Sequence, residues 1–579
     1  MNFPDDESKL ADRVKWIIDQ CTASRNDRTE LYNRRERYFL FGTDGSNQVR
    51  YNRLESHIDL VAAFLYAPDH AFYNIAADRN ASDAVVKQAI ALQDEWNDDF
   101  QDDGLSDLVA EAIPWSLVYD TMMVKQGWND VREAQTCELI PPQNFGVFRE
   151  DIPDLDSQQA FCHTYFLDWS EAAQRVIRAG RGTELARIAV ENKPFVSPFP
   201  DLLNRMIISA TGGENLQGNI IGQVNPSYVP LATYQPKVDT PLVRFNELWA
   251  WDSDAEDYRI FHMVDPDILI SDSKKTVSAL LKAGRMTGKM KTDEKFSKSE
   301  TNYFLPKDHP FTKVQPYTKY NYFWGKAHVD TLMPLQDWMT ERLEQIADIL
   351  ERQAYPPKVG SGFMGLTDEK MEAFGGADTY LFDQMPQAKV EELRPEMPPD
   401  MFADFKEING LFLEASGLTE VLQGRGDTGV RSRQHAQELK KTGGGRIKRA
   451  ALKLEPSLVR IGDLGLKLKM KNDGNEIIPE PDDKGKSEPF VPAQLASEIH
   501  MRIEGHSHSP LFGDESKETA VLLKKADAID AEMFVRMLNP PNRDAIIHSL
   551  RLKKIAAAKM AAEHPELAAQ AAGGGKRRK

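Results

Sequence analysis

The chain contains little cysteine and no long hydrophobic run, and both absences exclude classes of protein. Its 579 residues include three widely separated cysteines, Cys21, Cys137 and Cys162. This odd and scattered set predicts neither a disulfide framework nor a CxxC metal site, and it favours a reducing compartment. The longest apolar stretch, residues 60–67, is far shorter than the roughly 18 residues of a membrane span, and the acidic residues 1–7 predict no secretory signal. We therefore expect a soluble protein.

Positive charge is in the minority. The chain has 72 Lys and Arg residues against 89 Asp and Glu residues, so its formal net charge is −17. This balance argues against a broad basic face that coats DNA, because neutralised phosphates supply most of the affinity of such a face. Residues 425–471 nevertheless hold 13 basic and 4 acidic side chains, which leaves −26 for the rest of the chain. This basic stretch has two interpretations, contact with DNA phosphates or salt bridges with acidic surfaces of neighbouring subunits.

Hydrophobic patterning predicts a multi-domain, helix-rich α+β protein of about three to five compact units. Residues 1–130 carry mainly the periodicity of helices, as in residues 14–21. From 121 to about 272, short β-branched and aromatic runs between Pro and Gly turns predict strands. The Pro- and Gly-rich residues 193–235 predict a long irregular insertion. Seven acidic residues and no basic one between 94 and 107 predict a solvated helix end.

Two predicted helices with an insert between them are the most regular part of the sequence. Apolar side chains recur at intervals of three and four along residues 326–354, which predicts one long helix. Residues 399–417 predict a second helix, with Gly417 as its C-terminal stop. The Pro- and Gly-rich residues 355–398 predict a small module at the tip of this helix pair.

Five carboxylates share one face of the first predicted helix, because they are spaced by four, three, four and three residues. They are Asp337, Glu341, Glu344, Asp348 and Glu351. Like charges this close repel one another, so one interpretation is a solvated surface. The other interpretation requires a closed ring of identical chains with this helix turned inward. Each carboxylate then becomes a ring of negative charge around a channel, along which a polyanion slides without sticking.

Motifs of enzymes are nearly absent. Residues 424–429 match GxGxxG, but they follow a helix and no βαβ unit surrounds them, so they predict a loop and not a dinucleotide site. Residues 485–487 lack the preceding glycine that a P-loop requires. Asp267, Asp272 and Lys274 resemble the constellation of a Mg²⁺-dependent nuclease, although the short gap between the carboxylates leaves no room for a turn between two strands. A metal-dependent DNA-processing enzyme is therefore kept as an alternative.

The order of these elements resembles that of the portal proteins of tailed bacteriophages over about residues 10–560. The motifs that carry the resemblance are NRLESHID at 52–59, FLYAP at 64–68, VKQGW at 124–128, IPPQNFG at 140–146, GKAHVD at 325–330 and GVRSRQ at 429–434. None of them is a catalytic signature. The specificity lies in their order and in the series of helix, insert, helix, glycine loop and basic helix.

The resemblance implies a portal fold that assembles as a ring, typically dodecameric, around a central channel. The implied domains are a wing (1–325), a first stem helix (326–354), a clip (355–398), a second stem helix (399–417), a tunnel loop (418–431), a basic helix that returns to the wing (432–485), crown helices (486–565) and a disordered basic tail (566–579). The chain would then be structural and not an enzyme, with no cofactor and no metal.

The resemblance also implies a location and partners. The ring would stand at one vertex of the virion capsid, after assembly in the host cytoplasm, as the channel for packaging and ejection of double-stranded DNA. Its partners would be other copies of itself, DNA, the terminase large subunit, the major capsid and scaffolding proteins, and the head-completion or tail adaptor proteins, with no membrane. The remaining alternative is another structural virion component, such as a minor capsid or adaptor protein.

Two sets of site residues follow from this hypothesis. Asp404 and Glu407 of the second helix join the five carboxylates of the first in the predicted channel lining. The expected DNA contacts in the tunnel loop are Gly424, Arg425, Gly426, Arg431 and Arg433.

Overall fold

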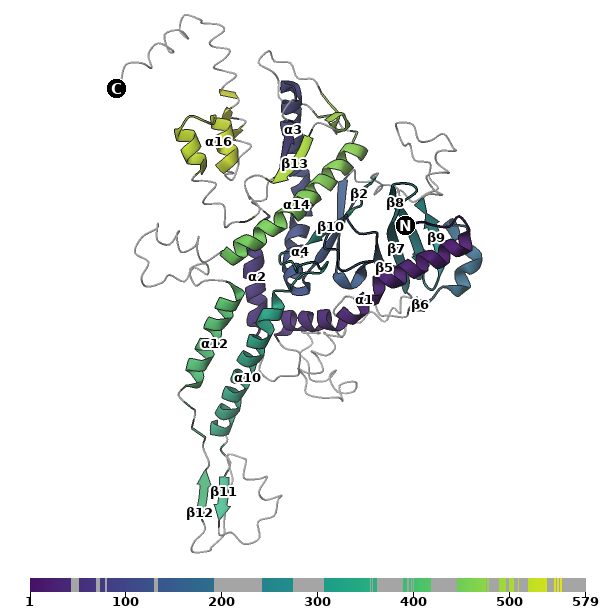
Figure 1. The fold of residues 1–579 in the computed structure, drawn as a ribbon. Coiled ribbons are helices and arrows are strands. Elements are labelled where there is room, and N and C mark those ends of the chain that lie inside the picture. Colours follow the sequence, from purple (N-terminus) through teal and green to yellow (C-terminus); the bar gives the residue numbers. More distant parts are fainter. Residues whose placement is uncertain are drawn as a thin grey trace, which may run out of the picture.

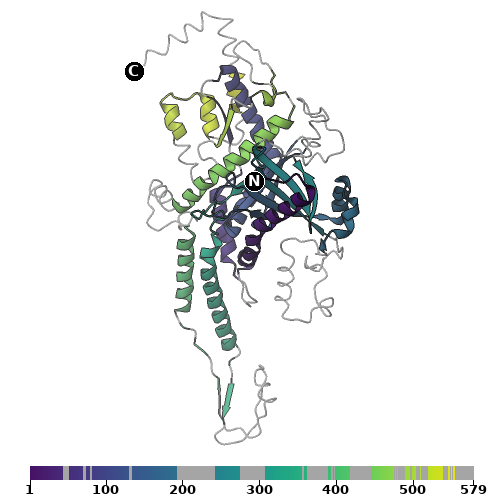
Figure 2. The same cartoon turned by 45° about the vertical axis from the view of Figure 1, so that its right-hand side comes forward.

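The computed structural model shows a broad body from which two long helices project (Figures 1 and 2). It describes residues 1–42, 51–68, 73–78, 81–129, 134–191, 242–273, 307–354, 358–361, 389–392, 400–417, 445–474, 489–495, 499–503 and 519–538, with a few isolated residues between and after these ranges. All paired strands in the described part are antiparallel. The chain is therefore a helix-rich α+β protein with several small sheets.

Five helices of the body contribute to the largest hydrophobic core. They are α1 (Glu7–Phe41), α2 (Arg53–Leu65), α3 (Asp83–Asp102), α4 (Leu105–Tyr119) and α14 (Gly445–Asn472). Asn52 starts α2 as a capping residue, because its side chain accepts from the Glu55 backbone N–H at 3.2 Å and donates to the Glu55 carboxylate at 3.0 Å. The apolar face of α14 is fully buried in this core at Leu454, Leu458 and Ile461.

Two sheets pack face to face beside the helices. The larger has the order β4–β5–β7–β8–β9 with β6 paired to β7, and the smaller has the order β10–β2–β3. Their strands are β2 (Met122–Asn129), β3 (Ala134–Ile140), β4 (Phe145–Val147), β5 (Ala160–Asp168), β6 (Val190–Glu191), β7 (Leu242–Asp252), β8 (Asp257–Val264), β9 (Ile268–Asp272) and β10 (Phe311–Val314). Buried aromatic rings fill the space between the sheets, with Phe161 in contact with Phe311 and stacked on Trp249. Short helical segments join or flank these strands, namely η1 (Pro142–Asn144), α5 (Trp169–Arg178) and η2 (Gly182–Arg187).

A separate two-stranded sheet joins the two ends of the chain. β1 (Tyr73–Ala77) pairs with β13 (Ile499–Ile503), which follows the short turn η6 (Pro492–Leu495). Side chains of α3 satisfy the other edge of β1: Asn97 Oδ1 accepts from the Tyr73 N–H at 2.9 Å, and Gln93 Oε1 accepts from the Ile75 N–H at 3.0 Å. A further helix, α16 (Ala531–Leu538), lies in the C-terminal part.

The projecting helices are α10 (Val329–Ala354) and α12 (Met401–Ser416). They lie side by side, and beyond them β11 (Lys358–Ser361) pairs with β12 (Lys389–Glu392) at the tip (Figure 1). Gly417 ends α12 with a backbone φ of 76°, a left-handed conformation that favours glycine.

Most of the secondary structure expected from the sequence is present. The two helices of the pair, the helical N-terminal region and the strands between 121 and 272 are confirmed. The expectation of helices alone after residue 486 is wrong, because β13 lies there and pairs with β1. The insertion 193–235 and the basic tail lie outside the described residues. None of the helices in the described part combines the length and apolar character that a bilayer crossing requires.

Candidate functional site

The base of the helix pair is held to the body by polar contacts. Arg35 of α1 donates from Nε and Nη2 to the two carboxylate oxygens of Asp330 in the first turn of α10, each at 2.7 Å. About two turns further along α10, α1 makes a second contact, in which the Tyr38 hydroxyl donates to Asp337 Oδ1 at 2.7 Å. Gln336 Nε2 donates to the Tyr51 carbonyl at 2.6 Å.

The five predicted carboxylates of α10 all lie on this helix but in different surroundings. Asp337 accepts from Tyr38 and therefore faces α1 at the base. Asp337 is nevertheless exposed, Glu344 is half-buried, and Glu341, Asp348 and Glu351 are exposed further along the helix. Glu341 Oε1 accepts from the Gln345 amide at 3.2 Å along the same helix. Three carboxylates thus form an exposed acidic row on the projecting part of α10.

The second helix contributes one partnered and one exposed carboxylate. Asp404 lies 3.6 Å from Nη2 of Arg342, a residue of α10 whose Nη1 also donates to Gln345 Oε1 at 2.7 Å. Glu407 is exposed. Arg342 therefore partly neutralises the acidic surface where the two helices meet.

Large apolar side chains are also exposed on the helix pair. Trp338 and Leu350 of α10 are 39% and 51% exposed, and Phe402 of α12 is 60% exposed. Leu332 and Met339 of α10, in contrast, are fully buried in the main core together with Ile408 and Phe412 of α12. The pair thus has one covered apolar seam and further apolar side chains that the single chain leaves in water.

The predicted DNA contacts in the tunnel loop cannot be compared with the structure. Gly424, Arg425, Gly426, Arg431 and Arg433 lie outside the described residues. The described part of the basic stretch begins with α14.

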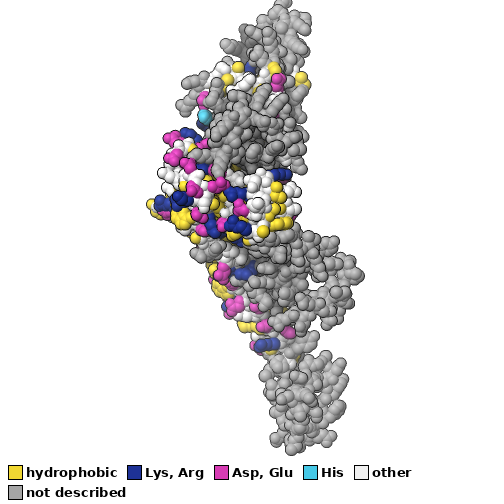
Figure 3. Space-filling view, turned by 90° about the vertical axis from the view of Figure 1, so that its right-hand side faces the viewer, with side chains coloured by type: hydrophobic (Ala, Val, Ile, Leu, Met, Phe, Trp, Pro, Cys, Tyr) yellow, Lys and Arg dark blue, Asp and Glu magenta, His cyan; other side chains and the backbone are white. Residues whose placement is uncertain are grey.

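The C-terminal half of α14 uses its basic side chains within the chain. Lys469 Nζ binds Glu95 at 2.8 Å and also contacts Asp99, both on α3. Burial lowers the pKa of Lys469, but these carboxylates outweigh it and the pKa is raised. The acidic residues 94–107 are therefore not only a solvated helix end, because two of them pair with Lys469 of the basic stretch within the same chain. On the face in Figure 3, basic and acidic side chains are interspersed over the described body.

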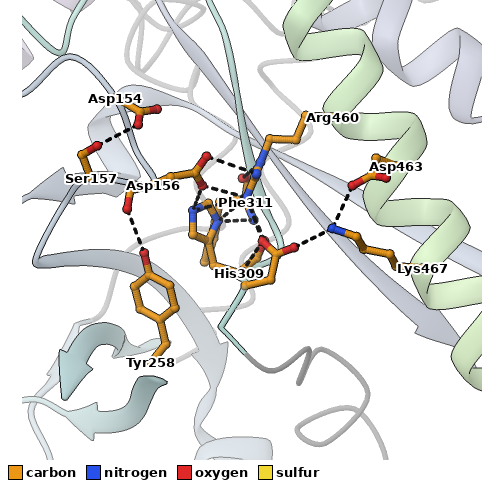
Figure 4. Close-up of polar contacts among 10 residues, drawn as sticks. Asp154, Asp156, Ser157, Tyr258, His309, Phe311, Arg460, Asp463 and Lys467 are labelled. Carbon is orange, nitrogen blue, oxygen red and sulfur yellow. Dashed lines mark hydrogen bonds and ion pairs between the residues drawn. The ribbon is translucent and has the colours of Figure 1, made fainter. Parts of the chain in front are cut away.

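A network of charged side chains holds α14 against the sheets (Figure 4). Arg460 of α14 lies 3.0 Å from Asp156 and 3.0 Å from Asp308, and His309 Nε2 lies 2.9 Å from Asp156. Lys467 lies 3.0 Å from Asp308. Asp156, Asp308 and His309 are near enough to share a metal ion, but the Arg460 guanidinium already supplies the positive charge between them. Burial lowers the pKa of His309. This network stabilises the packing of α14 on the sheets, and no residue spacing in the sequence predicted it.

Each carboxylate of the nuclease constellation is paired with an arginine. Arg259 holds Asp272 through two hydrogen bonds of 2.9 and 2.7 Å in a buried pair, whereas Asp267 is partly exposed and lies 2.7 Å from Arg187. Lys274 lies outside the described residues. Because each carboxylate has its own arginine, the two do not form a shared site for Mg²⁺.

Two comparisons with known proteins gave no relative. No protein-family model matches the chain, and no curated protein matches its sequence. A functional argument therefore depends on the residues themselves.

Proposed function

We propose that the chain is the subunit of a portal ring, a structural protein that forms the channel for double-stranded DNA at a capsid vertex. The observation that carries the proposal is the projecting pair α10/α12, which bears exposed carboxylates and exposed large apolar side chains on the same two helices. Neither property suits an isolated helix pair, because apolar side chains in water and a row of like charges are both unfavourable. A ring gives a use to both.

In the ring, neighbouring pairs would cover the apolar side chains. Trp338, Leu350 and Phe402 would be buried between adjacent copies, which is the usual role of large exposed aromatic and aliphatic groups. Glu341, Asp348, Glu351 and Glu407 would line the channel. Asp337 and Asp404 would serve as supports and not as lining, because Tyr38 and Arg342 already engage them.

An acidic lining suits a passage and not a binding site. DNA phosphates gain affinity from lysine and arginine through the release of counterions. Carboxylates have the opposite effect, so the helix pair would let DNA move without holding it. The basic residues of the loop 418–431 would supply the transient contacts, and the tip with β11 and β12 would dock the terminase motor and later the head-completion proteins. The wing would contact the capsid and scaffolding proteins.

Electron microscopy of the purified full-length chain tests the proposal. We expect closed rings with an axial opening, and a mass that is a multiple of 65.4 kDa. Particles without an opening would overturn it and favour a minor capsid or adaptor protein. A map of the ring also tests the lining, because carboxylates of α10 on the outer wall would refute that part alone. An incubation of the chain with duplex DNA and Mg²⁺ should leave the DNA intact.

A further inference from the structure

Arg35 connects two segments of the body with the helix pair. Besides its two bonds to Asp330, it donates from Nη1 to Asp120 Oδ2 at 2.9 Å and to the Tyr119 carbonyl at 3.0 Å. Arg35 lies on α1, Asp120 follows α4, and Asp330 opens α10. The Arg35 side chain is only 2% exposed. One guanidinium therefore fixes the start of α10 against two elements of the body.

The two carboxylates differ in their access to water. The Asp120 side chain is 4% exposed, whereas that of Asp330 is 31% exposed. If the bond to Asp330 opened, water would solvate Asp330, and Arg35 would remain with Asp120 as a buried neutral pair. An unpaired buried charge is very unfavourable, and this arrangement avoids one. Of the two contacts of Arg35 with carboxylates, the one to Asp330 can therefore open at the lower cost in free energy.

The apolar packing at the base does not fix the angle of the helices by itself. Leu332 and Met339 of α10 pack with Ile408 and Phe412 of α12 in the main core. Hydrophobic attraction has no preferred direction, so such a seam tolerates small rotations. Charged hydrogen bonds in a bidentate pair are directional. The orientation of α10 therefore depends on its directional contacts with the body. The Arg35–Asp330 pair is the charged one, and the Tyr38–Asp337 bond and the two hydrogen bonds of Gln336, to the Tyr51 carbonyl and from the Arg53 N–H, are the neutral or singly charged ones.

We propose that Arg35 and Asp330 form a latch that sets the angle between the helix pair and the body, and whose opening lets the pair tilt about its buried apolar seam. The β11–β12 tip lies at the far end of the pair (Figures 1 and 2). A load on the tip therefore acts on the latch through the length of both helices. This inference goes beyond the proposed function, since it requires neither a ring nor DNA.

Pulsed electron paramagnetic resonance on the full-length chain tests the latch. Spin labels on noncanonical residues at Gln174 of α5 and Ala354 of α10, both exposed, report the distance between body and helix pair. Labelled chains are diluted with unlabelled chains so that only distances within one chain are measured. We expect one narrow distance population in the unmodified chain. Asp330→Asn should add a second population of roughly 10% or more.

Two further variants make the result decisive. Glu414→Gln removes an exposed charge from α12 and should leave the distance unchanged. Arg35→Lys keeps the charge beside Asp120 but cannot reach both carboxylates with a planar fork, so it should reproduce the Asp330→Asn result. A distribution identical to that of the unmodified chain in both latch variants overturns the proposal. It is equally overturned if these variants lower the unfolding temperature without a change in distance, because the contact would then only stabilise the fold.

Discussion

The body and the projecting helix pair treat charge in opposite ways. In the body, Lys125 and Glu247 form a buried pair at 2.7 Å, and Arg259 holds Asp272 with both carboxylate oxygens engaged. In the helix pair, Glu341, Asp348 and Glu351 lie exposed. These two buried carboxylates of the body are matched by cations within the chain, whereas the three exposed carboxylates of the helix pair face the solvent.

Apolar side chains show the same contrast. The space between the two sheets of the body is filled by rings such as Phe161 and Trp249, which are almost wholly inaccessible to water. On the helix pair, Trp338 and Phe402 are well exposed. The sheets of the body thus bury their rings within the single chain, whereas the projecting helices leave two large rings in water. Substitutions in both regions test this difference, from the largest expected effect on stability to the smallest.

Removal of a ring from the body should have the largest effect. Phe161→Ala leaves a cavity among Phe145, Trp249 and Phe311 and should lower the free energy of unfolding by about 3–5 kcal/mol. The matched change Phe402→Ala, on the helix pair, should cost less than about 1 kcal/mol because that ring is mostly in water already. Urea unfolding followed by circular dichroism measures both. Equal losses would remove the distinction between the two regions.

Loss of a buried ion pair in the body should have the second-largest effect on stability. Lys125→Met leaves Glu247 buried without its ammonium partner and should cost about 3 kcal/mol at neutral pH. In the double variant with Glu247→Gln, the amide still accepts from the Trp249 indole, so more than half of the loss should return. Chemical unfolding of the two variants checks the coupling, and a double variant as unstable as the single one would contradict it.

The same pair predicts a response to acid. Burial raises the pKa of Glu247, but Lys125 and the nearby histidines outweigh it and hold the value at about 2. A carboxyl whose folded pKa is depressed stabilises the fold above its ordinary pKa of 4.5, and this stability is lost as the pH falls towards 2. Lys125→Met/Glu247→Gln should therefore unfold with a weaker pH dependence between 4.5 and 2.

Glu36 should give a smaller dependence of stability on pH, in the opposite direction. Burial raises its pKa to about 7, although the Tyr119 hydroxyl donates to it at 3.0 Å. The folded state then retains a proton that the unfolded state loses above about 4.5, so stability falls as the pH rises towards 7. Glu36→Gln should gain about 1–2 kcal/mol at pH 8 and little at pH 4. Unfolding midpoints at the two pH values test this, and an equal gain at both would rule out titration of Glu36.

Replacement of the exposed carboxylates of α10 by neutral amides should have the smallest effect on stability. The triple variant Glu341→Gln, Asp348→Asn and Glu351→Gln should change the free energy of unfolding by no more than about 0.5 kcal/mol. If these groups line a channel, the same variant should slow DNA movement through assembled rings. A large loss of stability would instead mean that the acidic row is part of the fold.

The elements that depend on local pattern could be predicted from the sequence. The period of apolar residues predicted the two helices of the pair, and the β-branched and aromatic runs between 121 and about 272 predicted strands, among which are β5 and β7. The acidic row of α10 follows from the helix period, but the period cannot tell that Tyr38 engages Asp337. That contact depends on where α1 lies, and no local pattern contains this information.

Contacts between distant segments were the part that the sequence did not reveal. Apolar and polar residues alternate in Ile499–Ile503, which is a sequence signal for a strand. The signal does not say that the strand pairs with β1. In the same way, the acidic residues 94–107 and the basic stretch 425–471 each have an obvious charge, but only the fold brings Lys469 to Glu95. The Asp156–His309–Arg460 network likewise joins three distant segments.

The pairing of β1 with β13 also has a consequence in time. Tyr73 pairs with Ile503, 430 residues later in the chain. At a synthesis rate of roughly 5–20 residues per second, the ribosome needs about 20 to 90 s to deliver the second strand after the first. During that interval one edge of β1 has no partner, while α3 already covers the other edge through Asn97 and Gln93. The nascent chain thus carries one open strand edge until residues 499–503 are made, and the β1–β13 sheet closes late in synthesis.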